Sequence, residues 1–172
     1  MKRTVLFIVI FVCGLLSVQA TKQSKAGILS TFMKEWGVKT IALWAHPLCT
    51  LNADKTIITT NPNSVIITLF YSNGSKDFSC RYNLQINSNG NFSSFMVQQD
   101  GSPKDRCFAA CNKNKDWQKN LKMYKEDKTI VSTLEQVLHR NYSTFDCQDY
   151  ALMGLTYYWM KEGYKEKYLS KE

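Results

Sequence analysis

The chain has 172 residues, of which 44% are hydrophobic and 21% charged, and its formal net charge is +8. This length is enough for one domain with a sizeable core. The lysines are spread along the sequence rather than gathered in blocks, so the positive charge favours solubility over a dedicated basic face, and no nucleic-acid partner is expected.

The first twenty residues have the pattern of a secretory signal peptide. A basic start, Met1–Arg3, precedes an apolar run over Thr4–Val18, and small residues flank Gln19 before a cleavage site after Ala20. The run is too short to span a bilayer. We therefore expect a secreted, extracellular protein with a single disulfide-stapled globular domain over residues 21–172. That domain has 20 basic and 14 acidic residues, a net charge of +6.

Loss of the leader removes Cys13 and leaves five cysteines. In an oxidising compartment they are expected to pair, and one is left over, which could link two chains. Fifteen arrangements are possible. Two cysteines one helical turn apart are aimed poorly at each other, and their spacing is a weak zinc signal, so disulfides are preferred to a metal, and no cofactor is expected. The candidates are Cys49, Cys80, Cys107, Cys111 and Cys147.

The elements before the turn-rich centre are a helix and two short strands. Apolar residues recur at helical spacing over Ser24–Trp36, and Ser24 is a plausible cap. Val38–Ala45 is predicted to be a strand. Thr56–Thr60 has the composition of another strand, and Asn61-Pro62-Asn63 separates it from the next one, which begins near Val65.

Two Asn-Gly pairs, Asn73-Gly74 and Asn89-Gly90, predict two hairpins with type I′ turns, because both central residues of such a turn need a positive φ. The register follows from the turns. The expected facing pairs are Leu69 with Phe78, Ile67 with Cys80, Val65 with Tyr82, Leu84 with Phe95, and Tyr82 with Val97.

This register gives the three-stranded ribbon from Val65 to Gln99 one apolar face, since strand side chains alternate. The rest of the chain must cover that face. The opposite face is either a contact surface or a set of scattered exposed residues. On the middle strand Phe78, Cys80, Tyr82, Leu84 and Ile86 point inward. The apolar residues of the opposite face are Ile66, Phe70, Phe92 and Met96.

Three helices are predicted downstream. The first covers Asp105–Tyr124, the second begins after Asp127, and Asp146 caps the last. The second helix has an apolar stripe of Ile130, Val131, Leu134, Val137 and Leu138, and the last has one face made of Tyr150, Met153, Tyr157, Met160, Tyr164 and Tyr168.

The predicted fold class is α+β: an N-terminal helix, an antiparallel β-meander of about four to five strands, and C-terminal helices packed on the sheet. The alternative treats segments around Cys107, Lys128–Val131 and Tyr150–Trp159 as strands, which makes an eight-stranded barrel with a flanking helix. In size and layout the chain then resembles the lipocalin-type carriers. The Glu35-Trp36-Gly37 triplet does not match the Gly-x-Trp start of that family, so no membership is inferred.

The sequence favours a binding protein over an enzyme. No nucleophile elbow, phosphate loop or EF-hand spacing occurs. The expected function is a secreted, glycosylated interaction protein whose partner is an extracellular protein, an acidic glycan or a small apolar ligand. The candidate sugar acceptors are Asn73, Asn91 and Asn141, and the candidate ligand contacts are Tyr82, Leu84, Phe95, Tyr150, Met153 and Tyr157.

Two alternatives stay open. One is an extracellular carrier of a small apolar ligand, held in a barrel or between the sheet and the last helix. The other is a secreted nuclease or hydrolase that uses His46 and His139 as an acid/base pair. A pocket on the apolar face of the sheet would favour the carrier, and the two histidines in one cleft would favour the enzyme. A flat apolar patch around Phe70 and Met96 would favour partner binding.

Overall fold

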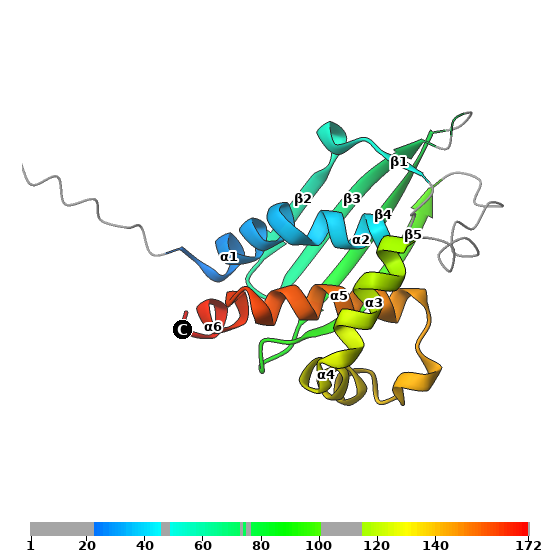
Figure 1. The fold of residues 1–172 in the computed structure, drawn as a ribbon. Coiled ribbons are helices and arrows are strands. Elements are labelled where there is room, and N and C mark those ends of the chain that lie inside the picture. The colour runs from blue at the N-terminus through cyan, green and yellow to red at the C-terminus, as the bar shows by residue number, and fades with distance from the viewer. Residues whose placement is uncertain (1–22, 46–48, 73, 75–76, 101–114, 172) are drawn as a thin grey trace, which may run out of the picture.

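A computed structural model describes residues 23–45, 49–72, 74, 77–100 and 115–171. An open antiparallel sheet is covered on one face by helices (Figure 1), so the predicted α+β class is confirmed. The strands are β1 (Thr50–Leu51), β2 (Ile57–Asn61), β3 (Ser64–Ser72), β4 (Asp77–Ile86) and β5 (Phe92–Asp100). The helices are α1 (Lys25–Phe32), α2 (Val38–Ala45), α3 (Lys115–Glu126), α4 (Lys128–Leu138), α5 (Cys147–Lys161) and α6 (Tyr164–Leu169).

The N-terminal helix is longer than predicted. Ser24 caps it as expected, since its Oγ accepts a hydrogen bond from the Gly27 amide at 3.1 Å. The strand predicted over Val38–Ala45 is wrong, because a π-helical turn at Met33–Gly37 carries the helix on into α2. The extra residue of a π turn shifts the helical phase, and Ile41 then lies fully buried in the core.

The sheet has the strand order β1-β3-β4-β5, and β2 pairs with β3 as well. Strands β1 and β2 share one edge of β3, separated by a short 3₁₀ turn at Ala53–Lys55. The sheet is open, so the barrel alternative is wrong. Two of its proposed strands, Lys128–Val131 and Tyr150–Trp159, lie in α4 and α5 because their apolar residues follow helical spacing, and the segment around Cys107 lies outside the described residues.

The first hairpin keeps the predicted faces but not the predicted register. Leu69 pairs with Cys80 rather than with Phe78, and the last pair is Ser72 with Asp77. Four residues therefore connect the strands instead of two. Because the register differs by two, side chains stay on their predicted faces.

The second hairpin has the predicted register but a different turn. Leu84 pairs with Phe95 and Tyr82 with Val97, as expected. Gly90 has a φ of +70°, whereas among the described residues other than glycine only His139 has a positive φ. The Gly90 amide donates to the Asn87 carbonyl at 2.9 Å, so the Asn89-Gly90 pair is not a type I′ turn.

A β-bulge follows this turn and changes the face of one residue. Ile86 pairs with Phe92 and Gln85 pairs with Ser94, so Ser93 is the extra residue. Phe92 consequently points into the core and is fully buried. Its predicted place on the opposite face, beside Met96, is wrong.

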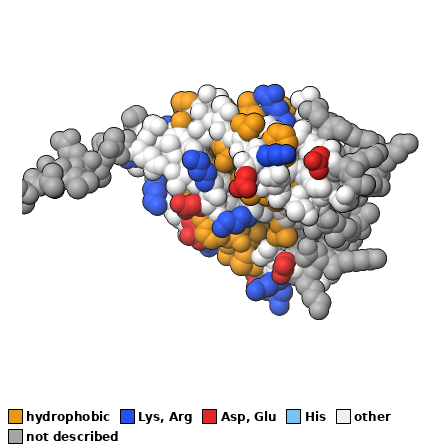
Figure 2. Space-filling model, turned by 90° about the horizontal axis from the view of Figure 1, so that it is seen from above, with side chains coloured by type: hydrophobic (Ala, Val, Ile, Leu, Met, Phe, Trp, Pro, Cys, Tyr) orange, Lys and Arg blue, Asp and Glu red, His pale blue; other side chains and the backbone are white. Residues whose placement is uncertain are grey.

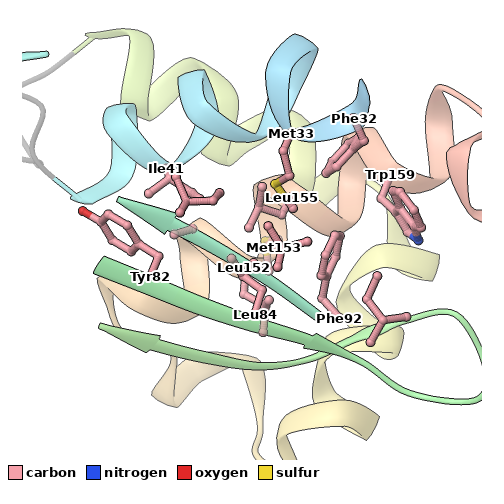
Figure 3. Close-up of a cluster of buried hydrophobic side chains, with 14 of the residues drawn as sticks. Phe32, Met33, Ile41, Tyr82, Leu84, Phe92, Leu152, Met153, Leu155 and Trp159 are labelled. Carbon is pink, nitrogen blue, oxygen red and sulfur yellow. The ribbon is translucent and has the colours of Figure 1, made fainter. Parts of the chain in front are cut away.

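Helix α5 lies at the centre of the helical layer and packs against α2, α3, α4 and β5. The single apolar face predicted for it is incomplete, because Leu155 and Trp159 on its other side are also fully buried. The predicted last helix is divided by Gly163, whose φ is +70°, into α5 and α6. Figure 3 shows Leu84 and Phe92 of the sheet pointing toward the helical residues of this core.

Helix α6 contacts the turn between β2 and β3, the turn between β4 and β5, and the N-terminal helix. The Tyr168 hydroxyl donates to the Pro62 carbonyl at 2.7 Å, and Lys165 donates to the Asn91 side chain at 2.7 Å. Tyr164 donates to the Glu35 carboxylate. Burial, together with this carboxylate, raises the pKa of Tyr164 to about 12. These contacts explain why the charged tail packs on the molecule.

Both predicted aspartate caps are confirmed. The Asp127 carboxylate accepts from the amides of Thr129 and Ile130 at 3.0 and 3.2 Å, at the start of α4. Asp146 begins α5 in a capping box with Asp149. The Asp127 carboxylate also bonds to Lys161 of α5 at 2.7 Å, which joins the two helices.

Replacing Asp127 with asparagine should remove the ion pair with Lys161 while keeping the cap of α4. The hydrogen bond from Lys161 is the main cause that lowers the pKa of Asp127, so the ionised carboxylate stabilises the fold above its unfolded-state pKa of about 3.9. Asparagine still caps the helix. We expect Asp127→Asn to lower the urea midpoint at pH 7. The difference should shrink as the pH falls through the lowered folded-state pKa. An equal deficit at pH 7 and at about pH 3 would contradict this assignment.

Candidate functional site

The predicted ligand contacts do not form one site. Tyr82, Leu84 and Met153 are fully buried in the core, and the ring of Phe95 stacks on Tyr82 with centroids 5.6 Å apart. The two remaining residues lie half-buried on α5 among other aromatic rings, Tyr150 near Tyr142 and Phe145, and Tyr157 near Tyr124 and Tyr158. Their role in binding a ligand stays a prediction.

The phenol group of Tyr82, under the sheet, is held in its neutral form. The hydroxyls of Tyr71 and Tyr82 are 3.3 Å apart in the core. Burial, with a smaller contribution from Tyr71, raises the pKa of Tyr82 well above its usual value. Tyr82 therefore keeps its proton in the ordinary pH range, and its hydroxyl serves packing and hydrogen bonding.

The side of the sheet opposite the helices, which we call the open face, is the first candidate site. The outward residues alternate with the buried ones, and Ile57 and Met96 expose 55% and 58% of their surface. The face consists of Thr50, Ile57, Thr59 and Asn61 of β1 and β2, Ser64, Ile66, Thr68, Phe70 and Ser72 of β3, Asp77, Ser79, Arg81, Asn83 and Gln85 of β4, and Ser94, Met96 and Gln98 of β5.

The open face lacks lysine and glutamate. Asp77 and Arg81 are the charged residues among its described side chains, and the register adds Asp100 opposite Ser79, whereas lysine is frequent in the rest of the chain. The side of the molecule in Figure 2, by contrast, shows basic and acidic side chains interspersed. Loss of Lys and Glu, with Met and Arg retained, is part of the composition that distinguishes the cores of protein interfaces.

A hollow of about 400 Å³ lies at one end of the open face, where β1 meets β3 and β4. Its lining includes Phe70, which lies on the open face, and the inward residues Tyr71 and Phe78, whose rings stack with centroids 5.4 Å apart. Lys55 and Asp77 bring opposite charges to its rim. The described lining residues are Asn52, Lys55, Phe70, Tyr71, Ser72, Asp77, Phe78 and Ser79.

A second hollow of about 340 Å³ lies at the β5 side of the sheet. It combines the Arg81 cation, the Asn83 amide and the exposed Met96 side chain, and Val97 and Gln98 complete it. The open face is thus a shallow surface with a depression toward each of its sides. Sequence reasoning placed Phe70 and Met96 on this face but missed both hollows.

The histidine pair proposed for catalysis is not tested by the structure. His139 follows the end of α4, exposed and with a φ of +52°. His46 lies outside the described residues. The carboxylates near Cys147 have structural contacts: Asp149 accepts from Arg140 and from the Asp146 amide. Burial raises the pKa of Asp149 despite the nearby guanidinium.

The candidate disulfide residues are dispersed. Cys80 is buried on the inward face of β4, Cys49 is half-buried just before β1, and Cys147 opens α5. Cys107 and Cys111 lie outside the described residues. Within the described part of the chain, no three His, Cys, Asp or Glu residues gather closely enough to hold a metal ion.

The sugar acceptors differ in exposure. Asn141 is exposed between α4 and α5, and its side-chain oxygen accepts from the Ser143 amide and hydroxyl. Asn91 is half-buried and accepts from Lys165. Asn73 lies outside the described residues. In residues 23–45, 49–72, 74, 77–100 and 115–171, no helix has the length and apolar character needed to cross a bilayer.

Comparison with known proteins gives no assignment. The chain matches no protein-family model, no curated protein and no solved structure. Its function is therefore inferred from the open face and the two hollows on it.

Proposed function

We propose that this chain is an extracellular, non-catalytic protein that binds another protein through its open face. The observation that carries the proposal is the absence of lysine and glutamate from the strand positions of that face, in a chain whose net charge is +8. Bringing a charged side chain into a dry interface costs free energy unless it is paired, so a surface kept for contact loses such residues. Arg81, with five donors, is suited to remain.

The framework under the open face supports binding without rearrangement. Its central strands are paired on both sides, and the inward residues of β3 and β4, such as Ile67 and Leu84, are fully buried. Serine, threonine, asparagine and glutamine on the outward side offer short hydrogen-bonding groups held on a rigid sheet. Such preorganisation reduces the entropy lost on association.

The secretory features support an extracellular partner. The leader pattern over Met1–Ala20 and the exposed Asn141 are consistent with passage through the secretory route. Asn141 lies in the connection between α4 and α5, outside the strands that form the open face. A glycan there would leave the open face accessible.

Two charge-adding double variants test the proposal. Asn83→Lys with Gln85→Lys places two cations on the open face. Gln118→Lys with Gln148→Lys places the same charge on the helical layer, where both glutamines are exposed. The immobilised chain is exposed to extracellular fluid from its natural source, and retention is followed by biolayer interferometry. We expect the open-face variant to lose affinity for the retained partner by at least about tenfold, which corresponds to about 1.4 kcal/mol or more. The control variant should lose no affinity. Loss in the helical variant alone would refute the proposal.

The hollow beside Phe70 favours a second candidate function, a carrier of a small apolar ligand with a polar end. Its volume of about 400 Å³ falls in the range of ligand sites, and its lining includes the aromatic residue Phe70. Lys55 and Asp77 at the rim could hold a carboxylate or an amine. Native mass spectrometry of protein from its natural source should show a retained small molecule that Phe70→Ala loses. A ligand-free mass for the unmodified protein would exclude this carrier.

A further inference from the structure

Strand β5 forms an edge of the sheet that the core leaves partly open. Among the described residues only β4 pairs with it. The inward side chains Phe95 and Val97 are half-buried, whereas Leu84 and Tyr82, which face them on β4, are fully buried. Apolar surface on the inward side of an edge strand is stabilised when a further strand covers it.

The edge also lacks the features that usually prevent pairing. Native edge strands are kept short or carry lysine or proline. Strand β5 has nine residues, and Phe92–Gln99 contains no charge and no proline. Its one irregularity is the bulge at Ser93, near its start. Most of the strand is therefore regular enough to accept a partner strand.

We propose that β5 pairs antiparallel with β5 of a second copy of this chain, about a two-fold axis through Met96. In this register the residue n positions before Met96 in one copy faces the residue n positions after Met96 in the other. Inward residues therefore face inward residues, and outward residues face outward residues. On the inward side Phe95 faces Val97, and on the outward side Met96 faces Met96 and Ser94 faces Gln98. Apolar pairs and hydrogen-bonding pairs of this kind stabilise antiparallel ladders.

The charge distribution favours a second copy over an unrelated strand. Two copies of this positively charged chain repel each other, and their contact is most favourable where it contains no unpaired cation. The segment Phe92–Gln99 meets this condition along its length. A strand pair of this size buries little more than about 1,000 Å², so the dimer is a weak and concentration-dependent one.

The dimer extends the proposed function without depending on it. Joining two β5 edges makes one continuous sheet whose two open faces lie on the same side. A partner with two matching sites would then bind with increased avidity. Dimerisation is measured on the purified chain without any partner. A result against the dimer can therefore be distinguished from a result against partner binding.

The register allows a charge-swap test. Ser94→Lys with Gln98→Lys puts lysine opposite lysine twice in the dimer, whereas Ser94→Lys with Gln98→Glu puts lysine opposite glutamate twice. Both positions point outward from the strand, Gln98 exposed and Ser94 half-buried. Circular dichroism confirms folding of each variant. The intact chain is then followed by sedimentation velocity from about 5 to 500 μM, with and without reductant.

We expect the unmodified chain to dimerise with rising concentration, independently of reductant. The lysine–lysine variant should stay monomeric, shifting the midpoint at least about tenfold, and the lysine–glutamate variant should dimerise as well as the unmodified chain or better. A monomer at all concentrations would overturn the proposal. So would a dimer that reductant abolishes, a dimer of the lysine–lysine variant, or loss of the dimer in both variants alike.

Discussion

Replacing Trp159 with alanine is expected to lower the free energy of unfolding by about 3–5 kcal/mol. The side chain is fully buried, and its ring centroid lies 4.9 Å from that of Phe32 and 5.3 Å from that of Phe92. Its indole nitrogen donates to the Gly90 carbonyl at 2.8 Å. The variant thus opens a cavity between the helices and the second hairpin and removes the donor for a buried carbonyl.

Urea denaturation followed by far-UV circular dichroism measures this effect, since the tryptophan signal is altered by the substitution itself. Met160→Ala is the matched control, because Met160 is the next residue of α5 and only half-buried. Trp159→Phe keeps most of the ring volume and loses the hydrogen bond, so it should cost about 1–3 kcal/mol. If Trp159→Ala costs no more than Met160→Ala, the described packing of α5 on the second hairpin is incorrect.

The second large effect is a contrast within β5. Phe92→Ala should destabilise the fold by about 3–5 kcal/mol, whereas Met96→Ala should change its stability by no more than about 0.5 kcal/mol. In a regular strand the two residues would share a face, since they are four positions apart. The bulge at Ser93 reverses this, leaving Phe92 fully buried and Met96 58% exposed.

Equilibrium unfolding of the two variants at one temperature and pH makes the comparison. The slope of the free energy of unfolding against denaturant concentration should be the same for both variants. The midpoints then report stability alone. Equal losses for Phe92→Ala and Met96→Ala would mean that the strand is regular. The open face would then have to include Phe92, and its composition would change.

Much of the sheet could be predicted because its signals are local and periodic. The strict alternation from Phe78 to Ile86 fixed the faces of β4, and a register error of two at the first hairpin did not change them. The caps at Ser24, Asp127 and Asp146 were also predictable, since each depends on a side chain and on amides within three residues.

The features that could not be predicted depend on tertiary packing. Val38–Ala45 has strand-like residues, yet it continues a helix whose buried face includes Ile41. The bulge at Ser93 allows Phe92 to contact Trp159, and no pattern in the sequence predicts that contact. A central helix such as α5 is buried on more than one side, so its pattern has no single apolar face.

The candidate site was predictable only in part. Alternation placed Ile66, Phe70 and Met96 outward, but the sequence did not show that their neighbours form two hollows. One signal was present and unused: no lysine or glutamate occupies an outward position of β3, β4 or β5 up to Gln98. When lysine and glutamate are missing from the outward positions of several neighbouring strands, the pattern indicates a contact face.

Carbene footprinting of the intact chain tests the central claim, that one side of the sheet is left uncovered by the described helices and makes the functional contact. The chain is labelled in buffer and again in extracellular fluid from its natural source, and modified residues are located by mass spectrometry. We predict strong labelling of Ile57 and Met96 in buffer, lost in the fluid, with no change at Leu121 of α3. Absence of labelling in buffer, or protection confined to the helical side, would contradict the account.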